Sequence, residues 1–191
     1  MQAKFTLALV YGSAREGRLC DTVVDWLLTQ LPQMLAADIV IVIVDPADLI
    51  AESRIVRAEA ENRIARDLAR ADAFLIVTPE YNHGYTAALK ELIDSFYRPW
   101  WGKPVAFVSY GGISGGLRAI EQLRQVFAEL GAATIRETLS FTHAVERFDE
   151  NGNIRDPERT MRQLERLAKQ LSWWAVTLKA GRETVVLEEM A

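Results

Sequence analysis

The residues best suited to chemistry in this chain lie in three short loops, and the first loop could bind a phosphate. It spans residues 12–18, GSAREGR, between an apolar run and a helical pattern. The N-terminus of a helix offers unpaired N–H groups and a positive dipole end, which stabilise an anion. Ser13 adds a hydroxyl, and Arg15 and Arg18 add guanidinium groups that can form paired hydrogen bonds to a phosphate. The alternative is that Ser13 caps the helix while both arginines lie in solvent.

Two other phosphate motifs do not fit this first loop. No Gly-Lys-Ser/Thr follows it, so it is not a P-loop, and Ser13 and Ala14 stand where a dinucleotide fingerprint would need glycine spacing. A low-molecular-weight phosphatase loop would need an arginine six positions after Cys20, and that position is Trp26. We therefore expect Cys20 to be a packed side chain and not a nucleophile.

The second loop spans residues 78–84, TPEYNHG, before another helical pattern. Its proline and its Asn-His-Gly run favour a fixed turn, which could present backbone N–H groups to a planar polar ring. Glu80 could serve as a general acid, but no paired carboxylate lies nearby in the sequence. The alternative is a simple strand-to-helix turn with Asn82 or His83 near the cap.

The third loop spans residues 109–118, SYGGISGGLR, with four glycines in six positions. Glycine permits positive φ and lets a ligand approach the backbone closely. Tyr110 could stack on or flank a ligand ring. The alternative is a flexible surface loop.

The elements that must position these loops alternate between strands and helices. Apolar runs at 5–11, 39–44, 73–78, 105–109 and 134–141 predict strands. Helical periodicity covers 19–31, 88–96, 120–130 and 161–178, and a charged, Ala-rich segment at 55–71 is a further predicted helix. The run 39–44 has no polar alternation, which predicts a strand buried on both faces.

This alternation predicts an α/β fold: a flavodoxin-like three-layer sandwich in which helices cover both faces of a five-stranded parallel sheet of order 2-1-3-4-5. The three loops then follow the first, third and fourth strands. Ligands of such sheets bind beyond the carboxyl ends of the strands, where the strand order reverses. We therefore expect the three loops to form one site.

Length and charge narrow the classes of function. The 191 residues predict one domain, residues 1–191, and a net charge of −4 with a pI near 5.3 favours neither nucleic acid nor an anionic membrane as partner. The longest apolar run, 39–44, is too short to span a membrane, and the first residues lead into a strand without a signal peptide. One cysteine favours a reducing, cytoplasmic location, and two histidines far apart do not suggest a metal site.

Together the three loops resemble the NADPH-dependent FMN reductase family, which includes quinone, azo and chromate reductases. The matching segments are GSAR at 12–15, PEYN at 79–82, and SYGG at 109–112 with GG at 115–116. Their order and spacing match as well, and the likeness extends from about residue 5 to residue 141.

The resemblance implies an enzyme with non-covalently bound FMN that uses NADPH or NADH as co-substrate. Hydride would pass through the flavin to a small acceptor: a flavin, a quinone, an azo compound or a metal oxyanion. No catalytic side chain is implied, because the flavin carries the chemistry. Two alternatives remain open: a flavodoxin-type electron carrier without NAD(P)H activity of its own, and a flavin-free module that binds another phosphate ligand.

The resemblance also implies roles for individual residues. Ser13 and Arg15 would hold the FMN phosphate, and Arg18 would add a second cation or turn to solvent, since many members have serine at that position and asparagine at Cys20. The flavin would lie between two groups of residues: Pro79, Glu80, Tyr81 and Asn82 on one side, and Ser109, Tyr110, Gly111 and Gly112 on the other. A homodimer or homotetramer is implied, with these candidate interface aromatics: Tyr97, Trp100, Trp101, Trp173 and Trp174.

Overall fold

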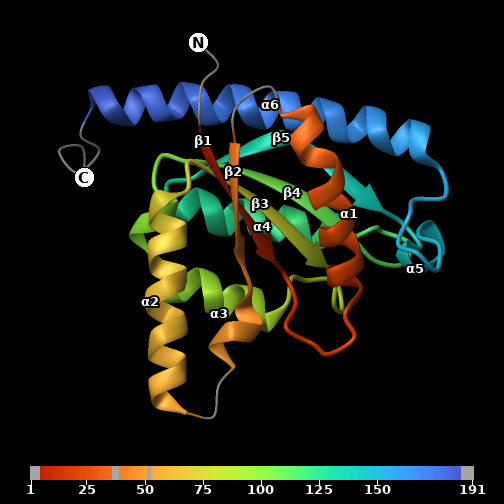
Figure 1. Ribbon diagram of the computed structural model, residues 1–191, viewed down its shortest axis with the longest axis horizontal. Coiled ribbons are helices and arrows are strands. Elements are labelled where there is room, and N and C mark those ends of the chain that lie inside the picture. Colours follow the sequence, from red (N-terminus) through yellow and green to blue (C-terminus); the bar gives the residue numbers. More distant parts are fainter. Residues whose placement is uncertain (1–4, 36–38, 51–52, 186–191) are drawn as a thin grey trace.

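The computed structural model describes residues 5–35, 39–50 and 53–185. They form three layers, with one sheet between two layers of helices (Figure 1). The strands are β1 (Phe5–Tyr11), β2 (Ile39–Val44), β3 (Ala73–Pro79), β4 (Pro104–Tyr110) and β5 (Ala133–Phe141). All neighbouring strands pair in parallel, in the order β2-β1-β3-β4-β5, so the predicted fold class is confirmed. Residues 1–4, where the absence of a signal peptide was predicted, and 186–191, the end of the predicted domain, lie outside the described residues.

Helices cover both faces of the sheet. They are α1 (Leu19–Met34), α2 (Arg54–Arg70), α3 (Ala87–Ser95), α4 (Leu117–Glu129), α5 (Ala144–Arg147) and α6 (Pro157–Thr184), with 3₁₀ turns η1 (Pro46–Leu49) and η2 (Arg98–Trp100). Side chains alternate across β1, so that Leu7 and Leu9 pack with α1 and α6, whereas Ala8 and Val10 pack with α2, α3 and α4. None of the helices in the described ranges combines the length and apolar character needed to cross a bilayer.

The prediction that residues 39–44 are buried on both faces is wrong. Val40 is 43% exposed and Ile43 is 42% exposed, and these two residues point to opposite faces of β2. These side chains are exposed because β2 is an edge strand, which pairs only with β1 in the sheet. The helices cover the middle of the sheet more fully than this edge.

The prediction that Trp100 is an interface residue is also wrong. Its side chain is fully buried inside the chain, with ring centroids 4.5 Å from Phe74 and 5.3 Å from Phe127. Tyr97 and Trp173 are 55% and 60% exposed, and the other two candidate aromatics are half-buried.

Candidate functional site

The sheet places the three loops side by side at its carboxyl edge. β3 and β4 end in register, with Pro79 opposite Tyr110, and the Glu80 N–H donates to the Tyr110 carbonyl at 3.1 Å. The first loop joins them because the Gly12 N–H donates to the Val77 carbonyl at 2.7 Å. Residues far apart in the sequence therefore share one site.

The first loop is pressed against β3. A Cβ at Gly12 would lie 2.6 Å from the Thr78 Cα, so only glycine fits there. The hydroxyl of Thr86, which caps α3 by accepting from the Leu89 N–H at 3.1 Å, donates to the Gly12 carbonyl at 2.6 Å. This close packing leaves Ser13 only 1% exposed.

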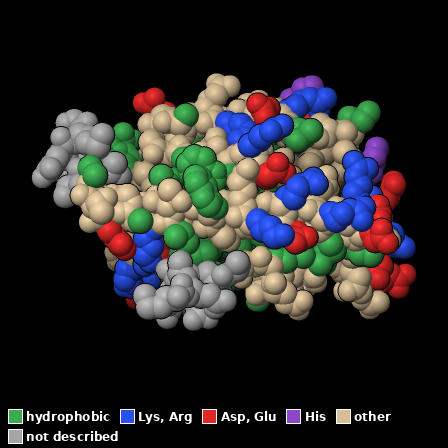
Figure 2. All heavy atoms as spheres, turned by 90° about the horizontal axis from the view of Figure 1, so that it is seen from above, with side chains coloured by type: hydrophobic (Ala, Val, Ile, Leu, Met, Phe, Trp, Pro, Cys, Tyr) green, Lys and Arg blue, Asp and Glu red, His purple; other side chains and the backbone are tan. Residues whose placement is uncertain are grey.

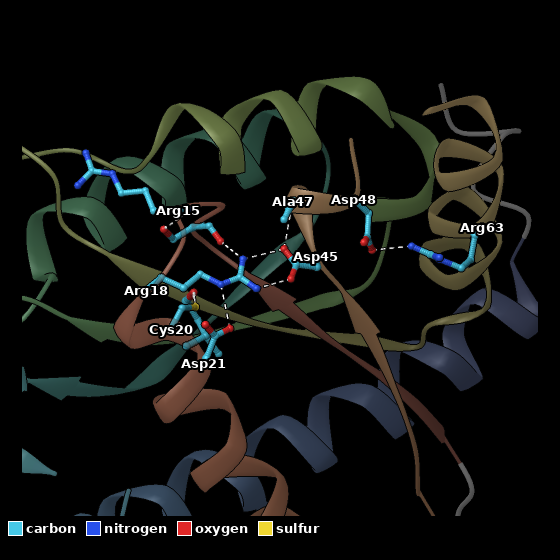
Figure 3. A network of polar contacts seen from close by, with 10 residues as sticks. Arg15, Arg18, Cys20, Asp21, Asp45, Ala47, Asp48 and Arg63 are labelled. Atoms are coloured by element: carbon cyan, nitrogen blue, oxygen red, sulfur yellow. Dashed lines mark hydrogen bonds and ion pairs between the residues drawn. The ribbon is translucent and has the colours of Figure 1, made fainter. Parts of the chain in front are cut away.

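The two arginines of the first loop lie in different environments (Figure 3). Arg15 is exposed, and its guanidinium carbon lies 4.1 Å from the ring centroid of Tyr81. Arg18 is largely buried and bonds to Asp45 and Asp21. The hydrogen bonds from Arg18 to Asp45 raise the pKa of this guanidinium further above its usual value, and burial opposes them only in part.

The second loop is a closed turn beside the first. The backbone groups of Tyr81 and Gly84 bond to each other in both directions, at 2.9 and 3.1 Å. Asn82 and His83 have φ of 50° and 70°, in the left-handed region, and both are exposed. The Tyr81 hydroxyl lies 3.2 Å from the Ser13 hydroxyl, so this turn touches the first loop.

The carboxylate of Glu80 points into the third loop. It accepts from the Ser114 hydroxyl at 2.7 Å and from the Arg118 backbone N–H at 3.1 Å, and it pairs with the Arg118 guanidinium at 2.8 Å. Burial alone would raise the pKa of Glu80, but these hydrogen bonds outweigh it and lower the pKa. An ionised, paired carboxylate is a poor general acid.

The third loop folds back over the end of β4. Gly116 has φ of 88°, and a Cβ there would lie 2.6 Å from the Ser109 Cβ. The Ser109 hydroxyl is fully buried and donates to the Gly115 carbonyl at 2.7 Å, so this side chain holds the loop from beneath. By contrast, a Cβ at Gly112 would point into open space.

A pocket of about 360 Å³ lies between the second and third loops. Its lining includes six residues expected from the sequence: Pro79, Glu80, Tyr81, Tyr110, Gly111 and Gly112. The Tyr110 hydroxyl is buried beside the Cys20 thiol and has no hydrogen bond of good geometry among the described residues, and burial raises the pKa of this phenol. Asn82 and Ser109 do not line the pocket, and the arginines lie outside it.

One side of the pocket was not predicted from the sequence. It is formed by Leu19 at the start of α1 and by the turn and short helix α5 that follow β5: His143, Ala144, Val145 and Glu146. This turn is tied to the third loop, because the His143 and Ala144 N–H groups donate to the Gly112 and Gly111 carbonyls at 2.9 and 3.0 Å. The available signal was that the fifth predicted strand also ends at this edge.

The residues present fit a flavin nucleotide. The pocket has the size of a small-molecule site, and its lining is mainly rings, glycine backbone and aliphatic carbon. The rings of Tyr81 and Tyr110 offer flat apolar surfaces to a bound ring, while Ser13 and Arg15 lie beside Tyr81 where a phosphate would need partners.

The part of the chain that carries these loops matches a known protein family. A model of the NADPH-dependent FMN reductase family matches residues 5–146, which include all three loops and the turn after β5. The chain belongs to this family.

Several relatives of this FMN reductase family member are informative. A quinone reductase of Pseudomonas putida is 33% identical over 175 residues, which cover 85% of this chain and 91% of the relative. An NAD(P)H-dependent FMN reductase of Schizosaccharomyces pombe is 32% identical over 126 residues, 58% of this chain. The matches to this protein and to an NAD(P)H-dependent FMN reductase of Saccharomyces cerevisiae span only 60% and 28% of those relatives.

Solved structures agree on the fold. The flavoenzyme NAD(P)H:(acceptor) oxidoreductase FerB of Paracoccus denitrificans has a TM-score of 0.70 at 23% identity, covering 90% of this chain and 97% of that one. An archaeal flavodoxin has a TM-score of 0.60 at 13% identity, covering 89% and 98%. At such identities the likeness concerns the fold alone.

Cys20 lies in α1, two residues after the first loop of this family member. The Cys20 thiol is buried and lies 3.4 Å from the Val77 carbonyl, so the prediction of a packed cysteine is confirmed. Burial raises the pKa of this thiol to about 11, which leaves it protonated at neutral pH.

Proposed function

We propose that this protein is an NAD(P)H-dependent oxidoreductase that binds FMN without a covalent bond and reduces a small acceptor. The observation that carries the proposal is the pocket between the second and third loops, which is lined by the rings of Pro79, Tyr81 and Tyr110 and by the backbone of Gly111 and Gly112. The buried Ser13 hydroxyl lies next to that pocket through its contact with Tyr81.

In this proposal the first loop holds the phosphate through Ser13 and Arg15. Pro79 and Tyr81 line one side of the ring, and the backbone of Gly111 and Gly112 lines the other. Asn82 shapes its turn through its left-handed backbone, and Ser109 supports the third loop from below. The Glu80 carboxylate bonds to Arg118 and Ser114 and so stabilises the third loop. Glu80 also lines part of the pocket.

FMN, when bound, supplies the redox chemistry by accepting a hydride from the nicotinamide and passing two electrons to the acceptor. The chain's part is to bind, orient and shield the ring. Glu80 is ionised and paired, and the pKa of Tyr110 is raised, so neither group is set to donate a proton at neutral pH. We therefore assign no catalytic acid or base.

Within this proposal the acceptor is a quinone or another flat aromatic compound. The unpredicted side of the pocket presents carbon from Leu19, Ala144 and Val145, which favours an apolar ring. Glu146 adds negative charge there, which disfavours a metal oxyanion. The relative from Pseudomonas putida is itself named a quinone reductase.

We also propose a homodimer or homotetramer in the cytoplasm. The exposed aromatic rings of Trp173 and Tyr97 support self-association, and the single, unpaired Cys20 supports a reducing compartment.

The test is reconstitution with FMN followed by assays of NADPH and NADH oxidation. We expect flavin absorbance to be retained after gel filtration, and faster NAD(P)H oxidation with a benzoquinone than with chromate. A protein that binds no FMN would contradict the proposal. Flavin that is bound but oxidises neither nicotinamide, and is reduced only through a partner protein, would favour the electron carrier.

A further inference from the structure

The guanidinium of Arg18 is occupied by partners within the chain. Its Nε donates to Asp21 Oδ1 at 2.9 Å, and its Nη1 donates to Asp45 Oδ1 at 2.8 Å and to the Ser13 carbonyl. Its Nη2 donates to the other carboxylate oxygen of Asp45. Figure 3 shows Arg18 enclosed between these carboxylates, while Arg15 points away from them.

The charge of this group does not favour a phosphate. Two carboxylates face one guanidinium, so the cluster has a net negative charge. Arg18 is 11% exposed at its side chain and lies over the ring of Tyr11, 4.4 Å from the centroid, which limits its freedom to turn toward a ligand. An incoming phosphate would have to compete with Asp45 for the same paired donors.

Asp45 links this cluster to the 3₁₀ turn η1. Its Oδ1 also accepts from the Ala47 N–H at 2.8 Å and so caps η1. Within η1, Asp48 pairs with Arg63 of α2 at 2.5 Å. The Ser13 carbonyl is therefore connected, through Arg18 and Asp45, to a turn that is itself fastened to α2.

We propose that Arg18 is a positioning residue that works as a pair with Asp45. The pair fixes the conformation of residues 12–18 in which the Ser13 hydroxyl and the Arg15 guanidinium hold the FMN phosphate, and Arg18 does not bind the phosphate itself. This inference rests on the proposed function, and it differs from the expectation that Arg18 supplies a second cation.

The deciding experiment is Asp45→Asn, with FMN and riboflavin as two probes that differ only in the phosphate. If the pair positions the loop, this variant weakens FMN binding by about tenfold, the scale of one lost hydrogen bond to a charged group. Riboflavin affinity then stays within about twofold of the wild type. Flavin fluorescence quenching measures both dissociation constants.

The two possible roles of Arg18, positioning the loop or binding the phosphate, predict opposite changes in FMN affinity for Asp45→Asn. If Arg18 bound the phosphate directly, Asp45→Asn would free its guanidinium and remove a nearby negative charge, so FMN binding would be unchanged or tighter. That result would overturn the proposal. An equal loss for both ligands would also overturn it, because it would mean a general effect on the fold.

Two further variants complete the design. Arg18→Lys keeps the charge but loses the paired geometry, so we expect it to weaken FMN about as much as Asp45→Asn. Asp94→Asn makes the same chemical change at an exposed carboxylate of α3 that pairs with Lys90, and it serves as the matched control, with both affinities expected to stay unchanged. An Arg18→Lys protein with wild-type FMN affinity would contradict a role based on geometry.

A readout without flavin separates this inference from the proposed function. Trypsin should cleave after Arg15 several-fold faster in flavin-free Asp45→Asn than in flavin-free wild type, because the loop loses its anchor. Equal cleavage rates would show that the pair does not fix the loop. Failure of the wild type to bind FMN would contradict the proposed function, whereas this cleavage comparison still tests the pair.

Discussion

At the scale of single residues, charged side chains near the pocket stabilise the conformations of the loops. The carboxylate of Glu80 has three donors, two of them from Arg118, and its side chain is 7% exposed. A buried carboxylate with several donors stabilises the conformation that supplies them. Glu80 therefore joins the second loop to the start of α4 across the glycine-rich third loop.

We predict that Glu80→Gln lowers the free energy of unfolding by about 1–3 kcal/mol at pH 7, because an amide cannot satisfy all three donors. Arg118→Ala is the matched variant and should cost less, since Ser114 and a backbone N–H still bond to Glu80. Urea unfolding measures both variants. A larger loss in Arg118→Ala would show that the ion pair, and not the hydrogen bonds to the loop, carries the stability.

The lowered pKa of Glu80 sets the sign of the pH dependence. In the folded state Glu80 stays ionised at pH values below its ordinary pKa of 4.5. The stability that the ionised carboxylate contributes is therefore complete above pH 4.5, and it is lost as the pH falls through the pKa of the folded state. The difference in unfolding free energy between wild type and Glu80→Gln should therefore shrink in acid. A difference that grew toward low pH would contradict this assignment.

At the scale of elements, α6 is held by ion pairs and a hydrogen bond near the amino ends of β3 and β4, whereas the site lies at their carboxyl ends. Lys179 and Arg182 of α6 both pair with Asp72, at 3.0 and 3.2 Å, and Arg182 also donates to the Gly102 carbonyl at 2.7 Å. Beside them Lys103 is buried, and it donates to the Leu68 and Ala69 carbonyls at the end of α2. The contacts with Asp72 and Gly102 hold α6 at residues that do not line the pocket between the second and third loops.

We predict that Lys103 makes stability rise with pH in a defined window. Burial, together with the nearby charge of Arg182, lowers the pKa of Lys103 from 10.5 to about 8. Between these values the unfolded chain binds the proton and the folded chain does not, so the free energy of unfolding contributed by Lys103 increases with pH. Relative to Lys103→Met, the wild type should gain about 1–3 kcal/mol between pH 8 and pH 10.

The measurement is urea unfolding of both proteins across that range. Taking the difference removes the groups that they share, including Tyr11 and Cys20, whose raised pKa values act in the opposite direction. Lys169→Met is the control, because Lys169 is exposed on α6 and should give a flat difference. A flat difference for Lys103→Met would contradict the prediction.

At the scale of the whole molecule, hydrophobic and charged side chains are distributed unevenly over the outer face of α6. Figure 2 shows hydrophobic side chains gathered toward the left of this face and charged side chains toward the right. The exposed hydrophobic residues of α6 include Trp173, at 60%, and Val176, at 36%. A large exposed aromatic ring with apolar neighbours is typical of an interface.

We predict that Trp173→Ser reduces self-association of the protein. The change removes a large apolar ring without disturbing the core, so the monomer should remain folded. Gel filtration with light scattering, at micromolar concentration and with FMN present, measures the mass. Ile55→Ser on α2 is the control, since Ile55 is 72% exposed on another element. A wild-type monomer, or a Trp173→Ser protein of wild-type mass, would contradict the prediction.

The sequence by itself determined the order of the elements and the chemistry at the ends of the strands. Apolar runs such as residues 5–11 and glycine positions such as Gly12 and Gly116 express local requirements: a buried strand, a contact too close for a Cβ, a positive φ. Since parallel strands place their carboxyl ends at one edge, these local signals also predicted that the three loops would meet.

Only the tertiary structure decided which partner each side chain has. Arg18 meets Asp45, Glu80 meets Arg118, and the turn at His143 closes a side of the pocket, each across a long stretch of sequence. The exposure of β2 and the burial of Trp100 were decided in the same way. Burial and pairing depend on which distant segments pack around a residue, and hydrophobic periodicity along one segment does not contain that information.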